Sequence, residues 1–303
     1  MKFRVYFGAL TSLLDIYTDI DAIVRFFKEG NVHFAYANIA FVGVSLLCQL
    51  IVVFIQNKKR GWKALMYESM IVCSMLKPAI DAKRVVSGNI QVENAFGDPQ
   101  LESTFNKCAE MIGESIPSSV LQTYALLGAS EVTNGPLFSI VISAGSIAYA
   151  STTISLDFDT NPANRLKAPN FYGYVPDNGR LAVMILMISI STSHVLLKVI
   201  ACSLMLRLNQ TWFIIYMTGD QSLYFLYKLL RGDWRYGLLL PGLVSWVVSV
   251  FVRVMIKTIV DFTLIIHYRH PFDLGGIYWS TNIVLNQAFC FVSVIYIGNT
   301  PQR

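Results

Sequence analysis

Pairs of charged residues four positions apart interrupt the most apolar stretches of this chain. Asp15 and Asp19 form the first pair, and Glu110 and Glu114 form the second. Side chains four residues apart lie on the same face of a helix, so each pair makes a stripe of carboxylates along one helix face. Such stripes predict an interior surface that binds a polar ligand by charge and hydrogen bonding.

More charged residues follow in the C-terminal half. The positions are His194 and Lys198, the stack of Arg253, Lys257 and Asp261, and Asp220 beside Gly219. A charge at the centre of a membrane costs about 2.5–3.5 kcal/mol, so about eight unpaired charges would exceed a typical net stability of about 5–15 kcal/mol. The charges must therefore face one another or water. We predict that the four acids line one interior surface and that Lys198 and Lys257 balance them from across it.

Two interpretations of these charges stay open. In the first, they form structural ion pairs, or reach the membrane surface from near a helix end, as Asp261 and Arg253 would. In the second, they line a hydrophilic track that a polar substrate touches. The number of separate stripes favours the track, because a bridge between two helices needs only one pair.

The composition is that of a membrane protein. Charged residues are 14% and apolar residues 54% of the 303 residues, whereas a soluble domain carries about 25% charged residues. Apolar stretches of about 20 residues, long enough to cross a bilayer, recur from end to end and predict a single integral membrane domain over 1–303. The net charge of +5 lies in short loops, so we expect no nucleic-acid partner. The five cysteines lack metal-ligand or disulfide spacing, and we expect neither a metal nor another cofactor.

The apolar pattern predicts an all-α, polytopic helix bundle. The segments are 5–28, 34–56, 64–82, 101–128, 137–157, 181–206, 212–230, 237–266 and 276–298. The third contains several charges and is flanked by positive residues on both sides, which favours a re-entrant segment over a span. About eight spans remain. The basic loop around Arg60 then lies inside, the 129–136 loop without Lys or Arg lies outside, and both termini are cytoplasmic.

Three residues predict irregular helices. Pro78 falls within the third segment, Pro117 follows Glu114, and Gly219 precedes Asp220. A proline removes a backbone donor and crowds the carbonyl four residues earlier, which for Pro117 belongs to Gly113. We expect a bend within a turn of Pro117 that directs both glutamates inward.

The first half of the chain contains a distinctive motif, Glu110-x-x-x-Glu114-x-x-Pro117-x-x-x-Leu121-Gln122-x-Tyr124. Together with Asp15-Ile16-Tyr17-Thr18-Asp19 and the segments 41–50 and 139–157, this motif resembles the XK-related family of membrane proteins. The resemblance covers roughly 10–157 and is weak over 181–303, where Lys198 stands near a position that is typically an intramembrane arginine in the family. Ser118 and Ser119 depart from the Gln-Leu that usually follows the proline.

The resemblance implies phospholipid scrambling, the exchange of lipids between leaflets without ATP, in the plasma membrane or an endomembrane. Its expected partners are membrane phospholipids and, by the same resemblance, an accessory membrane subunit or a lipid-transfer protein. An ion or small-solute transporter and a non-catalytic assembly component with structural ion pairs remain alternatives. No ATP-binding loop, H-E-x-x-H or G-x-S-x-G occurs in the sequence, so we expect neither a pump nor an enzyme.

Overall fold

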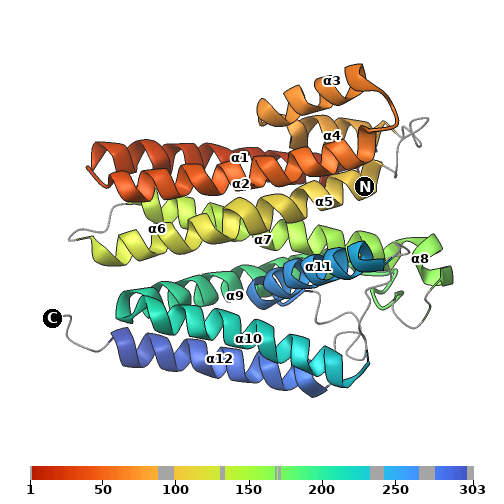
Figure 1. Ribbon diagram of the computed structural model, residues 1–303. Coiled ribbons are helices and arrows are strands. Elements are labelled where there is room, and N and C mark those ends of the chain that lie inside the picture. Colours follow the sequence, from red (N-terminus) through yellow and green to blue (C-terminus); the bar gives the residue numbers. More distant parts are fainter. Residues whose placement is uncertain are drawn as a thin grey trace.

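The computed structural model describes residues 2–87, 99–129, 134–167, 169, 172–232, 242–265 and 277–298. Over these residues the protein is helical, without strands, which confirms the predicted all-α class (Figure 1). The elements are α1 (Lys2–Lys28), α2 (Val32–Asn57), α3 (Trp62–Cys73), α4 (Lys77–Val86), α5 (Pro99–Glu110), the π-helical turn η1 (Met111–Ser115), α6 (Ile116–Gly128), α7 (Asn134–Thr160), α8 (Pro162–Lys167), α9 (Arg180–Leu208), α10 (Gln210–Leu230), α11 (Gly242–Thr263) and α12 (Ile277–Gly298).

Three of these helices, α2, α7 and α9, are long and apolar enough to cross a membrane, as far as the described residues extend. Their 26 to 29 residues correspond to about 39–44 Å of helix, which exceeds the roughly 30 Å of hydrocarbon. The bundle is therefore compatible with a membrane-embedded protein, and the arrangement of eight spans stays a prediction.

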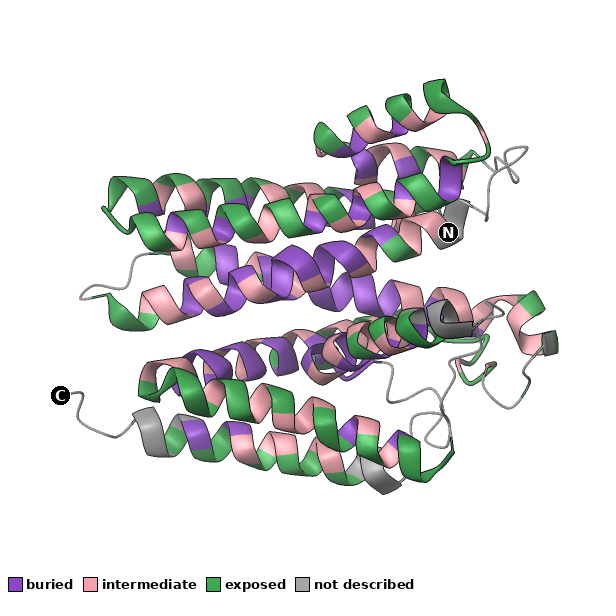
Figure 2. Cartoon of the chain, in the orientation of Figure 1, coloured by how far each residue is buried: buried purple, intermediate pink, exposed green. Residues whose placement is uncertain are grey.

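The polarity of α2 is the reverse of that in a soluble protein. Its buried face carries polar side chains such as Asn38, Ser45 and Gln49, whereas Leu47 and Phe54 are more than half exposed. Figure 2 shows the same division over the bundle, with burial concentrated in the middle layers and exposure along the outer helix faces. A helix in water turns its apolar stripe toward the core, so this reversal fits an outer surface that meets lipid.

The predicted third segment consists of two short antiparallel helices. α3 ends at Cys73, Met75 takes a left-handed conformation with φ of 58°, and α4 begins at Lys77 with Pro78 in its first turn. At 12 and 10 residues these helices measure about 18 and 15 Å, too short to cross the hydrocarbon. The predicted break near Pro78 is present, and the re-entrant placement in a membrane stays a prediction.

α7 lies at the centre of the bundle. It packs against α1 and α6 on one side and against α9 on the other, and α9 in turn contacts α10, α11 and α12 (Figure 1). The apolar core at this junction includes Val120 of α6, Ile147 of α7, Val199 of α9 and Phe262 of α11. This apolar core separates the polar residues between α1 and its neighbours from those among α9 to α12.

The break expected at Gly219 is not present. α10 continues as one α-helix from Gln210 to Leu230 through this glycine. A single glycine in a helix interior costs about 1 kcal/mol relative to alanine. This cost is too small for one glycine to end a helix that continues on both sides.

Candidate functional site

The acids of α1 are buried and held by hydroxyl and amide groups of η1, α6 and α7. Asp15 accepts hydrogen bonds from Ser115 at 2.7 Å and from Ser143 at 2.5 Å. Asp19 accepts from Ser118 at 2.7 Å and from Gln122 at 2.9 Å. Hydrogen bonds to a charged acceptor are about twice as strong as neutral ones, so these donors partly offset the burial of the two carboxylates.

The two glutamates, Glu110 at the end of α5 and Glu114 in η1, are hydrogen-bonded to serines of α1 and α2. Glu110 is hydrogen-bonded to Ser12 of α1, and Glu114 to Ser45 of α2. Glu110 and Glu114 also line a small cavity of about 10 Å³ between α1, α2 and the α3–α4 turn, which is enough for about one water molecule. The structure thus brings Asp15, Asp19, Glu110 and Glu114 together, and no ion pair of these four occurs within the described residues.

The π-helical turn η1 lies directly before Pro117. The Ile116 N–H bonds to the carbonyl of Met111, five residues back, instead of four. Pro117 has no N–H for the carbonyl of Gly113, so the α-helical pattern is interrupted at this point anyway. The irregularity expected near Pro117 is therefore a π-helical turn that contains Glu114, and the size of the bend stays a prediction.

Gly113 lies where α2 approaches this turn most closely. A Cβ atom at Gly113 would come within 2.9 Å of the Cα and 3.0 Å of the backbone N of Ser45, the residue that contacts Glu114. We predict that Gly113→Ala lowers the free energy of unfolding by about 1–3 kcal/mol, because backbone atoms cannot yield as a flexible side chain can. The control is Gly43→Ala on α2, where the added Cβ meets nothing within 4 Å. Equal stability of the two variants in thermal unfolding would contradict the close approach.

The acids belong to a longer column of polar groups along α1. At one end Arg4 forms an ion pair with Asp157 of α7, and the Tyr149 hydroxyl donates to the carbonyl of Arg4. At the other end Gln122, bound to Asp19, lines a pocket that also includes Arg25. Arg4 and Arg25 are separated by about 31 Å of helix, close to the roughly 30 Å thickness of the hydrocarbon core. The column therefore has the length needed to connect two membrane surfaces.

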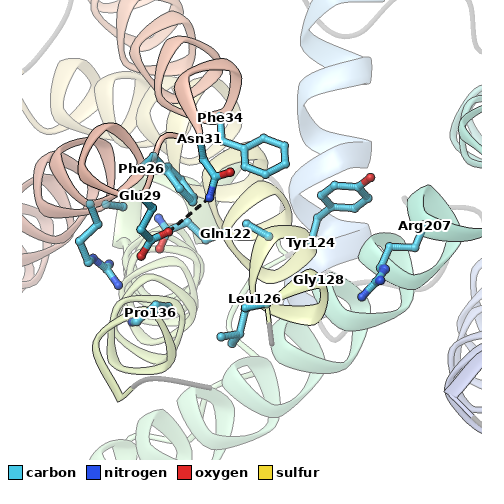
Figure 3. A pocket seen from close by; sticks show the side chains of 14 residues that line it. Phe26, Glu29, Asn31, Phe34, Gln122, Tyr124, Leu126, Gly128, Pro136 and Arg207 are labelled. Atoms are coloured by element: carbon cyan, nitrogen blue, oxygen red, sulfur yellow. Dashed lines mark hydrogen bonds between the residues drawn. The ribbon is translucent and has the colours of Figure 1, made fainter. Parts of the chain in front are cut away.

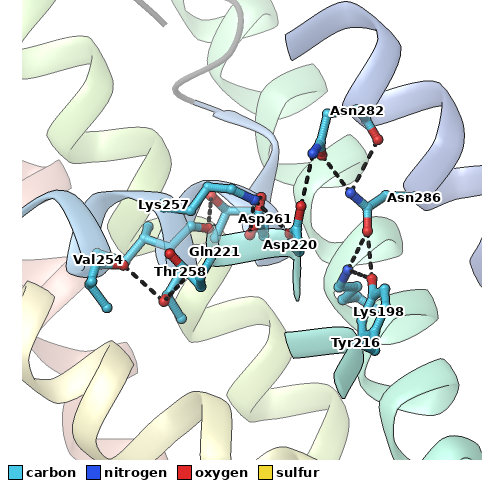
Figure 4. A network of polar contacts seen from close by, with 12 residues as sticks. Lys198, Tyr216, Asp220, Gln221, Val254, Lys257, Thr258, Asp261, Asn282 and Asn286 are labelled. Atoms are coloured by element: carbon cyan, nitrogen blue, oxygen red, sulfur yellow. Dashed lines mark hydrogen bonds and ion pairs between the residues drawn. The ribbon is translucent and has the colours of Figure 1, made fainter. Parts of the chain in front are cut away.

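Lys198 does not face the acids of α1, contrary to our expectation. Its ammonium group bonds to the hydroxyl of Tyr216 and, at 2.7 Å, to the side-chain oxygen of Asn286 (Figure 4). Tyr216 also bonds to Asn286 at 2.5 Å. Lys198 thus finds its partners on α10 and α12, because these helices and not α1 pack beside it.

Lys257 likewise belongs to the C-terminal cluster. It forms ion pairs with Asp220 of α10 at 2.6 Å and with Asp261, one turn along α11, at 2.5 Å (Figure 4). Asn282 of α12 donates to Asp220 at 2.9 Å. The expected balance between the four acids and the two lysines is wrong in its geometry, because Lys257 is balanced by Asp220 and Asp261 within its own cluster. Asp261 is buried in this ion pair, and its depth in a membrane stays a prediction.

A third charged cluster joins α3 and α4 to α5. Lys77, with 1% of its side chain exposed, lies 2.6 Å from Glu102, 3.0 Å from Asp81 and 3.3 Å from Glu68. Burial lowers the pKa of Lys77, but the carboxylates of Asp81 and Glu102 outweigh burial and raise the pKa above its ordinary value. The charged lysine therefore connects α3 and α4 to α5, the helix that ends at Glu110.

Several residues of the column escape prediction from the sequence. Four of them are serines in apolar helices, where the neighbouring sequence does not indicate the hydrogen-bond partner of a serine. They are Ser12, Ser45, Ser115 and Ser143. Ser118 could have been singled out from the sequence, because it departs from the Gln-Leu that usually follows the proline in the XK-related family. In the structure its hydroxyl donates a hydrogen bond to Asp19.

Comparison with known proteins gives no family. No model of a protein family matches the chain, and no curated protein matches it either. Within the described residues no group of three or more potential ligands is arranged to hold a metal ion. The resemblance to the XK-related family consequently stays a prediction, and a function must be argued from the site itself.

Proposed function

We propose that this protein is a polytopic membrane protein that scrambles phospholipids between leaflets without ATP, with the polar column as the path of the headgroup. The observation that carries the proposal is the alignment of polar groups along α1, from Arg4 and Asp157 past the four acids to Gln122. A headgroup cannot cross hydrocarbon cheaply, and a path with carboxylates, hydroxyls and arginines replaces its hydration.

An apolar groove beside the column provides room for the acyl chains. It has a volume of about 560 Å³ and lies between α1, α7 and α9, lined by residues such as Phe7, Val141 and Ile188 together with Arg4. A lipid whose tails occupy this groove would bring its headgroup to the Arg4 end of the column. This arrangement agrees with lipid exchange, in which tails stay in an apolar environment while the headgroup crosses.

The column is closed in this conformation. Asp15, Asp19, Glu110 and Glu114 are each less than 10% exposed. Transport of a headgroup therefore requires α1 to separate from α6 or α7, and the ion-paired α3–α4 hairpin must allow this movement. We propose that the structure represents the inactive state.

A second candidate function is passage of a cation. The specific observation in its favour is the closed acidic interior, where four carboxylates meet hydroxyl and amide donors and a small cation needs far less opening than a headgroup. Vesicles that exchange labelled lipid without ATP support scrambling, whereas cation flux without lipid exchange supports this alternative.

The proposed topology has its own test. We expect the basic loop around Arg60 to be cytoplasmic, because loops rich in Lys and Arg remain on that side. A cysteine introduced by Arg60→Cys should react with a membrane-impermeant thiol reagent only after the cytoplasmic side is opened to it. Labelling of intact cells at this position would contradict the topology.

A further inference from the structure

A pocket of about 490 Å³ lies at the end of the column opposite to Arg4. It is formed where α1 ends and α2 begins, together with the end of α6, the start of α7 and Arg207 of α9 (Figure 3). Gln122 belongs both to this pocket and to the column, because its side chain donates to Asp19 at 2.9 Å. A molecule in the pocket would therefore contact the column directly.

The pocket carries opposite charges on opposite sides. Figure 3 shows Glu29 on one side and Arg207 on the other. Arg207 is anchored by a hydrogen bond to the carbonyl of Leu127. Arg25, which also lines the pocket, has its guanidinium 3.0 Å from Asp21. A guanidinium with several N–H donors suits a phosphate, and the separated carboxylate suits a cation, so the charges fit a zwitterion.

A buried acceptor on the lining of the pocket indicates which kind of cation fits. The Nε2 of Gln122 donates to Asp19 and to Ser118, both at 2.9 Å, which leaves its carbonyl oxygen Oε1 as an acceptor. This Oε1 is buried without a hydrogen-bond partner. A buried acceptor without a donor is unfavourable, and a primary ammonium group has three N–H donors to supply. A quaternary ammonium has none.

We propose that this pocket binds a zwitterionic phosphate headgroup with a primary ammonium group, such as phosphoethanolamine. Gln122 and Glu29 receive the ammonium group, and Arg207 binds the phosphate. The inference rests on the proposed function in one respect, namely that a membrane lipid is the source of the headgroup. The shared chemistry also occurs in soluble glycerophosphoethanolamine, which makes a direct probe possible.

The test is calorimetric titration of the purified protein in phosphatidylcholine nanodiscs. We expect glycerophosphoethanolamine to bind about tenfold more tightly than glycerophosphocholine, because one hydrogen bond to a charged group corresponds to roughly that factor. Gln122→Met should remove this discrimination, and Glu29→Gln, at an exposed position, should weaken glycerophosphoethanolamine binding. The control is Asp177→Asn, whose carboxylate is 78% exposed and lies outside the pocket. Equal binding of the two compounds by the unmodified protein, or no effect of Glu29→Gln, would overturn the assignment.

A second arm identifies the source of the headgroup. Phosphatidylethanolamine added to the nanodisc should lower the apparent affinity for glycerophosphoethanolamine by competition. An unchanged affinity for glycerophosphoethanolamine would show that the lipid is not the ligand of this pocket. Because binding is measured without lipid flux, failure of lipid exchange in vesicles would count against the proposed function and leave the binding result standing.

Discussion

Replacement of Lys77 by methionine is expected to lower the free energy of unfolding by about 3–5 kcal/mol. The ammonium group lies within 3.3 Å of carboxylates from Glu68, Asp81 and Glu102, and only 1% of the side chain is exposed. Without Lys77, Arg84 still pairs with Glu68 at 2.7 Å, but the carboxylates of Asp81 and Glu102 lose their short ion pairs to the ammonium group. The loss of one partner costs about this amount in other buried ion pairs. Chemical unfolding in detergent, followed by circular dichroism, measures the change.

Lys63→Met is the matched control, since Lys63 is an exposed lysine on α3 of the same hairpin. The effect of Lys77 also has a defined pH dependence. Its pKa is raised in the folded protein, so its stabilisation is complete below the ordinary lysine pKa of 10.5 and is lost only as pH rises through the raised value. A Lys77→Met variant as stable as Lys63→Met at neutral pH would show that the cluster contributes little to folding.

Asp19→Asn is expected to slow lipid exchange at least about tenfold while the protein remains folded. Asparagine keeps a side-chain oxygen that can accept from Ser118 and Gln122, as Oδ1 of Asp19 does. What it removes is the negative charge and the second acceptor Oδ2, which is buried without a partner. Loss of one charge-assisted hydrogen bond to a passing headgroup corresponds to this factor in rate. The measurement is the rate of exchange of dye-labelled lipid in vesicles.

Asp21→Asn is the control for this variant. Asp21 lies two residues further along α1, is half exposed and pairs with Arg25. The exchange rate should be unchanged in Asp21→Asn. If Asp19→Asn also exchanges lipid at the normal rate, its carboxylate has a structural role only and the column is not the path.

The local features of the site were predictable because they follow from helical spacing. Residues four apart on one helix must share a face, so Asp15 with Asp19 could be placed together before any packing was known. The position of Pro117 located the irregular turn, since a missing N–H disturbs a helix wherever it occurs. The interior position of the charged residues was predictable as well, because charges within long apolar runs must face one another or water.

Partners on other helices could not be predicted from spacing. Lys198 was expected opposite the acids by its sign alone, yet it meets Tyr216 and Asn286, because α9 packs against α10 and α12. The choice of neighbours depends on how whole helix faces fit. The close packing of η1 against α2 could not be predicted either, because Gly113 and Ser45 are far apart in the sequence.

The most direct test of the account uses purified protein in liposomes that contain a dye-labelled phospholipid in both leaflets. A membrane-impermeant reductant is added outside without ATP, with and without calcium, and a soluble dye trapped inside reports vesicle integrity. The account predicts that the reductant eventually bleaches inner-leaflet dye in vesicles with protein, in at least one calcium condition, while the trapped dye survives. Inner-leaflet dye that stays protected in both conditions, as in protein-free vesicles, would contradict it.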